Sequence, residues 1–248
     1  MPEQDQALYA ICLVIEDQIT VHDLQAAMTS QAAIDWQVLQ AAEQVTELAC
    51  IDKSTPTILL DLRQSAENCD LYERALAAGI HVIGNSLECV PDLPRFLLLA
   101  AQNEVRFMFG ASFGDGLPIL ATLAEARRQG TLSELTAFLH GDLANGQMIS
   151  AIQLLALSAF GGFLPERRLG EALSFKGQSA RVEIKNVDQT FHLTVQPDSG
   201  VPETHPSLIA KGTNGQVYEV SATTGRDALS QLYAKDLEDI LSALDSAH

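Results

Sequence analysis

Glycine is missing from the first third of this 248-residue chain, where the first glycine is Gly79. In a dinucleotide-binding sheet, glycines in the turn after the first strand let the backbone approach the pyrophosphate closely. Here the residues after the first apolar run read Glu16-Asp17-Gln18-Ile19-Thr20. This sequence excludes the glycine-rich fingerprint of standard NAD(P)-binding proteins. Two interpretations of Glu16 and Asp17 stay open: they cap the next helix, or they repel phosphate.

Basic residues are scarce as well. The chain has 15 Lys and Arg against 32 Asp and Glu, a net charge of −17, and residues 1–78 hold 13 acidic and only 3 basic side chains. Such a field repels nucleic-acid backbones and anionic lipids, so we expect no nucleic-acid or membrane partner. Apolar runs are far shorter than the roughly 20 residues of a membrane span. The first residues also lack a secretory signal pattern, and the expected location is cytoplasmic.

The four cysteines form no metal-binding pattern. Cys12, Cys50, Cys69 and Cys89 include no CxxC pair and have no histidine at ligand spacing. The spacing predicts buried, reduced thiols and no metal site.

Residues 1–110 alternate between strand-like and helix-like patterns. Apolar runs of strand length lie at 8–15 and 57–62, and further strands are predicted at 34–39, 80–83 and 105–109. Helices are predicted at 21–28, 68–78 and 91–103. Repeated strand-helix-strand units predict an α/β fold with a Rossmann-like, mainly parallel sheet. Gly79 is placed to end the helix before it.

Residues 111–248 follow a different pattern, and we expect a second, α+β domain built on an antiparallel sheet. Helices are predicted at 118–128, 146–160 and 226–244, a hairpin at 181–196 and a strand at 216–221. Acidic side chains of the last helix (Asp236, Glu238 and Asp239) are expected to face solvent.

The stretch 58–120 resembles the central part of dihydrodipicolinate reductases. The resemblance rests on Val82-Ile83-Gly84-Asn85-Ser86 and on Ala111-Ser112-Phe113-Gly114-Asp115-Gly116, and residues 182–199 are similar to a hairpin of that family's second domain. The same stretch is similar to homoserine dehydrogenases, through Gly114-Asp115-Gly116-Leu117-Pro118-Ile119, and to the glucose-fructose oxidoreductase superfamily. The resemblance implies NAD(P)-dependent reduction of a small imine or carbonyl substrate and a homo-oligomer built through the antiparallel sheet.

The resemblance also implies a set of site residues. The catalytic candidates are His140 and Asp142; the cofactor-binding candidates are Gly84, Asn85, Ser86 and Ser112; the substrate-binding candidates are Asp115, Gly116, Asn145, Gly146 and Gln147. Loops at the carboxyl ends of parallel strands and backbone N–H groups at a helix start are the usual places for such contacts.

The chain lacks three sequence features that these families use for cofactor binding or catalysis. The glycine turn is lost, His140 is the one ionisable group left in the segment 136–141 that matches the reductases' catalytic histidines and lysine, and the lysine of the related superfamilies is missing near Asn85. Each candidate also has a structural alternative: a locally hydrogen-bonded turn at Asn85 and Ser86, a domain crossover at 110–116, and a helix cap with a surface imidazole at His140 and Asp142.

Two functions therefore stay open. One is a reductase that uses NAD(P). The other is a non-catalytic homologue without a cofactor, an oligomeric module that binds a small anionic ligand or regulates a protein partner. The absence of glycine before Gly79 favours the second. The resemblance downstream keeps the first open, and fold alone does not establish function.

Overall fold

The computed structural model describes residues 9–14, 19–29, 33–39, 55–62, 68–109, 119–139, 145–165, 169, 180–187, 190–197, 208–220 and 226–245. The chain divides into two compact units. Unit 1 comprises residues 1–110 and 224–248, and unit 2 comprises residues 111–223. The last helix thus belongs to unit 1, and our sequence-based assignment of it to the second domain is corrected.

Unit 1 is a parallel five-stranded sheet with helices on both faces, as the sequence predicts. Its strands are β1 (Tyr9–Val14), β2 (Ile34–Leu39), β3 (Thr57–Asp61), β4 (His81–Gly84) and β5 (Phe107–Phe109), in the order β2-β1-β3-β4-β5. All five residues of β3 are buried, which fits an apolar strand covered on both sides. The chain leaves β1 toward β2 on one side and places β3 on the other, so the switch point lies between β1 and β3.

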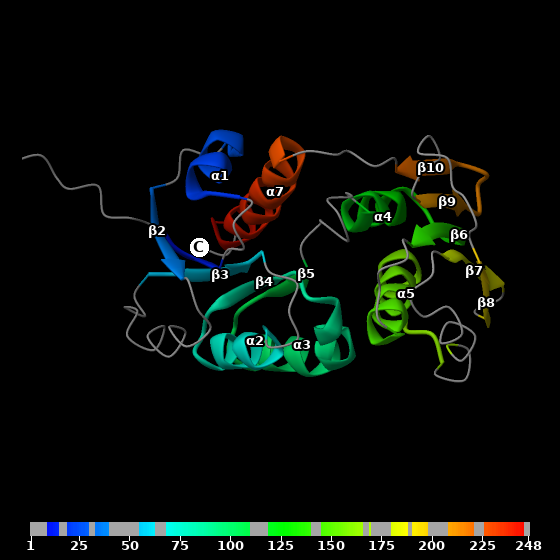
Figure 1. Cartoon of the computed structure of the whole chain (residues 1–248), viewed down its shortest axis with the longest axis horizontal. Coiled ribbons are helices and arrows are strands. Elements are labelled where there is room, and N and C mark those ends of the chain that lie inside the picture. Colours follow the sequence, from blue (N-terminus) through cyan, green and yellow to red (C-terminus); the bar gives the residue numbers. More distant parts are fainter. Residues whose placement is uncertain are drawn as a thin grey trace, which may run out of the picture. The chain divides into compact units, whose positions relative to one another are not determined.

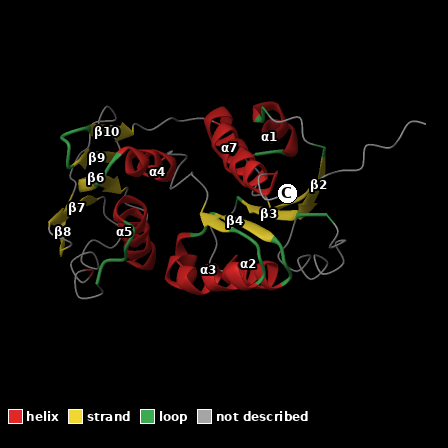
Figure 2. Cartoon of the chain, turned by 180° about the vertical axis from the view of Figure 1, so that it is seen from behind, coloured by secondary structure: helices red, strands yellow, loops and turns green. Residues whose placement is uncertain are grey.

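The described helices of unit 1 cover both faces of the sheet (Figures 1 and 2). They are α1 (Val21–Ala27) and α7 (Arg226–Asp245) on one face, and α2 (Asn68–Ala77) and α3 (Leu93–Gln102) on the other; the 3-10 helix η2 (Leu87–Asp92) precedes α3. Gly79, at φ +83°, ends α2 as predicted.

Helix α7 is fixed to the first unit by a shared core and by polar contacts. Tyr233, Leu237, Ile240 and Leu241 pack with apolar side chains of β1, β3 and α1. The Thr29 hydroxyl donates a hydrogen bond of 2.8 Å to Glu238 Oε1.

At the end of α7, the Tyr9 hydroxyl donates to the Asp245 carboxylate. This hydrogen bond, with burial, raises the pKa of Tyr9 to about 12. The acidic residues of α7 are not all solvated: Asp236 is buried and Glu238 is half-buried, so our expectation holds for Asp239 alone among the three.

Among its described residues, unit 2 has an antiparallel five-stranded sheet with helices α4 and α5 against it (Figure 1). Its elements are α4 (Ile119–Gln129), β6 (Leu132–Leu139), α5 (Asn145–Phe160), β7 (Ala180–Val187), β8 (Thr190–Pro197), β9 (Leu208–Gly212) and β10 (Val217–Val220), with strand order β10-β9-β6-β7-β8. The predicted hairpin is β7–β8. The sequence analysis did not predict β6, the central strand, or β9.

Candidate functional site

The turn after β4 lies at the carboxyl edge of the parallel sheet, where ligands bind in open α/β folds. It holds the predicted cofactor-binding residues Gly84, Asn85 and Ser86. Gly84 faces the ring of Tyr72 from α2 so closely that a Cβ at this position would lie 2.7 Å from Tyr72 Cε2. The close approach that this glycine permits is therefore made by a side chain of the protein itself.

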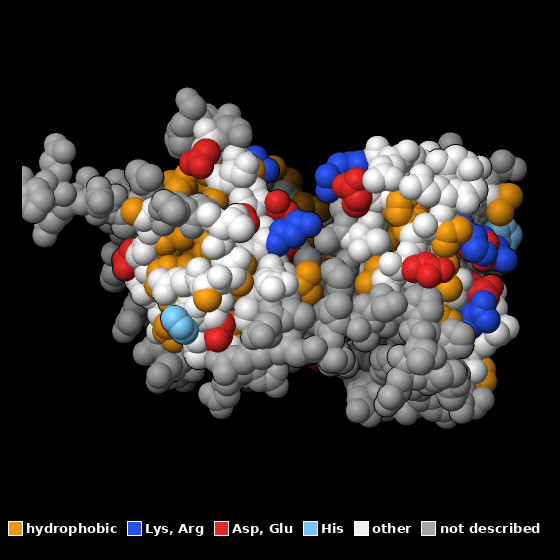
Figure 3. Space-filling view, turned by 90° about the horizontal axis from the view of Figure 1, so that it is seen from above, with side chains coloured by type: hydrophobic (Ala, Val, Ile, Leu, Met, Phe, Trp, Pro, Cys, Tyr) orange, Lys and Arg blue, Asp and Glu red, His pale blue; other side chains and the backbone are white. Residues whose placement is uncertain are grey.

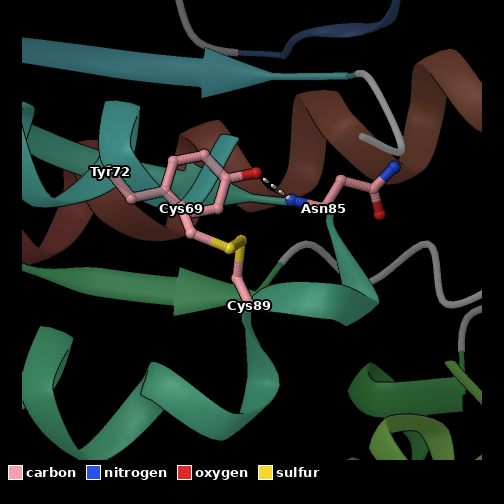
Figure 4. Close-up of a disulfide and its surroundings, with 4 residues drawn as sticks. All are labelled: Cys69, Tyr72, Asn85 and Cys89. Atoms are coloured by element: carbon pink, nitrogen blue, oxygen red, sulfur yellow. Dashed lines mark hydrogen bonds between the residues drawn. A yellow bond between two sulfur atoms is a disulfide. The ribbon is translucent and has the colours of Figure 1, made fainter. Parts of the chain in front are cut away.

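Tyr72 also satisfies the backbone of the turn. The Asn85 N–H donates a hydrogen bond of 3.1 Å to the Tyr72 hydroxyl oxygen (Figure 4). Tyr72 is fully buried, and its ring packs edge-to-face on Phe96 with centroids 6.0 Å apart. Burial, and then the charge of the nearby Asp61 carboxylate, raise the pKa of Tyr72 well above its ordinary value. The hydrogen bond from the Asn85 N–H to this hydroxyl oxygen holds the turn against α2.

The Asn85 side chain is turned toward α7. Its Nδ2 donates a hydrogen bond of 2.8 Å to the Tyr233 hydroxyl oxygen. The amide that the sequence assigns to a nicotinamide contact instead links the sheet edge to a helix more than a hundred residues later. Ser86 is buried beside it.

The start of α1 is the position where a dinucleotide-binding protein holds the pyrophosphate. Here Thr20 caps the helix: its Oγ1 accepts from the Asp23 N–H at 3.3 Å, and Asp23 Oδ2 accepts from the Thr20 N–H at 2.7 Å. This capping box satisfies two backbone donors and places a carboxylate in the first turn. The cap is therefore Thr20, and our interpretation of Glu16 and Asp17 as the cap is wrong.

Two of the cysteines are disulfide-bonded, which corrects the prediction that all four are reduced. Cys69 in α2 and Cys89 in η2 form a disulfide with Cα atoms 5.3 Å apart. Cys12 is a free buried thiol as predicted, and burial and then the Asp35 charge raise its pKa to about 11. Cys50 lies outside the described residues. Within the described part of the chain, no group of three or more His, Cys, Asp or Glu side chains could hold a metal ion.

Five of the predicted site residues lie outside the described residues: Ser112, Asp115, Gly116, His140 and Asp142. Asn145, Gly146 and Gln147 form the start of α5 in unit 2, and Gln147 is half-buried. Gly84, Asn85 and Ser86 are together in one turn of unit 1. The proposed roles of residues 112–116 and 140–147 stay predictions.

Sequence reasoning did not identify Tyr72, Tyr233 and Thr20 as the groups that occupy these positions. The Thr20-x-x-Asp23 spacing before an apolar pattern was a readable capping signal. No local signal could have linked Tyr72 or Tyr233 to the turn, because both contacts join distant segments. The described surface above α1 and α7 is mainly apolar and uncharged, with few charged side chains and no broad basic patch (Figure 3).

The sequence matches no protein-family model, and no curated protein sequence matches it. Solved structures resemble the fold over nearly the whole chain. A homoserine dehydrogenase from Thiobacillus denitrificans superposes with a TM-score of 0.65 at 13% identity, covering 96% of this chain and 74% of that one. One from Thermoplasma acidophilum gives 0.64 at 11% identity, covering 94% and 99%.

A hyperthermophilic archaeal homoserine dehydrogenase solved in complex with NADPH gives a TM-score of 0.63 at 12% identity, covering 95% of this chain and 98% of that one. At such identities the likeness shows the fold alone, a Rossmann-type dehydrogenase fold. The resemblance to homoserine dehydrogenases is thus supported at the level of the fold, and the resemblance to dihydrodipicolinate reductases stays a prediction. None of the described helices is long and apolar enough to span a bilayer.

Proposed function

We propose that this protein is a non-catalytic homologue on a dehydrogenase fold, an oligomeric binding or regulatory module that does not bind NAD(P) as dehydrogenases do. The observation that carries this proposal is the capping box at the start of α1. A pyrophosphate bound there would meet backbone donors already engaged by Thr20 and Asp23 and would face the Asp23 carboxylate.

The second cofactor position supports the same conclusion. A nicotinamide at the turn after β4 would need space and polar groups that Tyr72 and Tyr233 already engage. The residues present at both positions therefore do not fit a dinucleotide, and we derive no hydride transfer through this site.

A thermal-shift titration with NADH, NADPH and their oxidised forms tests this. Saturation at about 100 times the dissociation constant would stabilise the fold by roughly 2.7 kcal/mol. We expect no rise in melting temperature at tens of micromolar, and no energy transfer from the single tryptophan, Trp36 of β2, to NADPH. A clear rise accompanied by energy transfer would refute the proposal.

The same titration distinguishes a second candidate, an NAD(P)-dependent reductase of a small imine or carbonyl substrate. It is favoured by the extent of the fold similarity, which includes a protein solved with NADPH and spans 95% of this chain. Cofactor binding together with loss of turnover in a His140→Ala variant would establish it.

Self-association through residues 181–221 is the oligomeric part of the proposal. Strands β7 and β8 direct Val182, Ile184, Leu193 and Val195 inward, and no described element covers the opposite face of the sheet.

That opposite face carries ion pairs. Lys185 Nζ lies 3.7 Å from Glu134 Oε1, and Arg181 Nη2 lies 2.6 Å from Glu183 Oε1. A face with both signs can complement a second copy of itself across a two-fold axis. We expect light scattering to give the mass of an oligomer at micromolar concentration. A monomer mass would contradict this part of the proposal.

A further inference from the structure

The Cys69–Cys89 disulfide joins α2, whose Tyr72 contacts the turn after β4, to η2, which follows that turn. Cys69 lies in the first turn of α2 and Cys89 in η2, 20 residues later. The covalent loop therefore contains α2, β4 and all of residues 84–86. Figure 4 shows the disulfide next to the Tyr72 ring, with the Tyr72 hydroxyl directed at the backbone nitrogen of Asn85.

The two sulfur-bearing residues differ in access. Cys89 is fully buried, whereas Cys69 is half-buried. Thiol–disulfide exchange starts with a thiolate attacking a sulfur that it can reach, so Cys69 is the accessible target. Cys69 is also the second residue of a ten-residue helix, where the helix dipole favours a thiolate once the bond has opened.

The disulfide determines how both walls of the turn are held. Tyr72 follows Cys69 by three residues and so projects from the same side of α2. On the other wall, the Cys89 N–H donates a hydrogen bond of 3.1 Å to the Ser86 carbonyl at the end of the turn. The S–S bond thus ties η2 to α2, and with it the segment that keeps Asn85 against Tyr72.

We propose that Cys69–Cys89 is a redox-modification site for a dithiol, and that its reduction opens the turn at residues 84–86. A thiolate of the dithiol attacks Cys69 Sγ, the S–S bond breaks, and Cys89 leaves as a thiolate that takes up a proton. The second thiol of the dithiol then attacks the mixed disulfide and releases Cys69. The dithiol ends oxidised to a disulfide, and the two cysteines have gained its two electrons and two protons.

This inference is independent of whether the chain binds a dinucleotide. It also fits the expected location, because disulfides of cytosolic proteins are usually transient and redox-sensing. Reduction would expose the sheet edge that Tyr72 closes in the oxidised protein.

The test uses the full chain, oxidised and after incubation with dithiothreitol under native conditions. Alkylation and mass spectrometry report which cysteines are free, with buried Cys12 as the internal control. Amide hydrogen exchange is followed at Asn85 and, as a reference, at Ile11 in the centre of the sheet. We expect Cys69 and Cys89 to become labelled and exchange at Asn85 to rise about tenfold or more, with Ile11 unchanged.

A C69S/C89S variant should show the faster exchange at Asn85 with and without dithiothreitol, and a C12A variant should respond as the natural chain does. The proposal is overturned if Cys69 and Cys89 are already free in the air-oxidised protein or resist native reduction. It is also overturned if reduction leaves exchange at Asn85 unchanged, or accelerates exchange at Ile11 equally, since the disulfide would then be a global staple. The measurement on the natural chain decides the matter even if the double variant does not fold.

Discussion

Replacing Gly84 by alanine should destabilise the protein through Tyr72. The added Cβ would lie 2.7 Å from Cε2 and 2.9 Å from Cζ of the Tyr72 ring. Carbon atoms in contact lie about 3.5–4.0 Å apart, which gives an overlap of about 0.8 Å or more. The ring is poorly placed to move away, because it is fully buried and packs on Phe96 and Phe107, and because its hydroxyl oxygen accepts a hydrogen bond from the Asn85 N–H. Overpacking of this kind costs about 1–3 kcal/mol.

The assay is urea denaturation followed by circular dichroism, with Tyr72→Leu and the double variant completing a cycle. Tyr72→Leu alone should cost about 2–4 kcal/mol through the cavity that it leaves. Because it removes the clashing ring atoms, the double variant should lose about 1–3 kcal/mol less than the sum of the single losses.

Gly79→Ala is the matched control. Its Cβ would meet nothing within 4 Å, but its φ is +83°, so it should cost about 1–2 kcal/mol independently of Tyr72. A Gly84→Ala variant within about 0.5 kcal/mol of the natural chain would refute the reasoning and would favour a ligand as the reason for this glycine.

Two further predictions concern buried polar contacts of unit 1. His81 Nδ1 accepts the Arg106 N–H at 3.0 Å, and burial, then the Arg106 charge, lower the pKa of His81. His81 therefore takes up a proton near pH 6.5 in the unfolded chain, but only at lower pH in the folded chain. As pH drops below about 6.5, the free energy of unfolding should fall by up to about 1.4 kcal/mol per pH unit. In His81→Asn, whose Oδ1 can accept the same hydrogen bond without titrating, urea denaturation should show a shallower fall; an unchanged slope would rule His81 out. Tyr233→Phe removes the acceptor of the Asn85 side chain and should lower the free energy of unfolding by about 1 kcal/mol. The same change should cost less in an Asn85→Ala background; additive losses would show that the hydrogen bond between the two residues contributes nothing.

The parallel sheet could be predicted because its signal is local. The apolar run that predicts β3 matches the strand to within one residue, since a strand buried on both faces must be apolar throughout. Strand β6 escaped prediction because its register with β9 shifts between Leu132 and Glu134, which interrupts the alternation of buried and exposed positions.

The candidate site could be predicted less well because its contacts join distant segments. The sequence located the turn after β4, where Gly84 and Asn85 indeed lie, but not what fills it. Tyr72 comes from a neighbouring helix and Tyr233 from the far end of the chain. The sequence does not predict the partner of Cys69 either. Two cysteines 20 residues apart can pair only when β4 and the turn after it bring α2 and η2 together.

The fold and the chemistry of its edge have different physical origins in this chain. The sheet is specified by buried apolar strands such as β3, so it tolerates wide sequence change while its pattern is kept. The two cofactor positions depend on a few polar groups: backbone donors at the start of α1 and in the turn after β4. At the start of α1, Thr20 and Asp23 accept each other's backbone N–H groups. In the turn after β4, Tyr72 accepts the backbone N–H of Asn85, and Tyr233 accepts a hydrogen bond from the Asn85 side chain. A ligand at either position would have to replace hydrogen bonds already made, and each loss offsets part of its binding energy. Because both positions are occupied by groups of the protein itself, the loss of the glycine-rich turn alone does not account for the arrangement of this sheet edge.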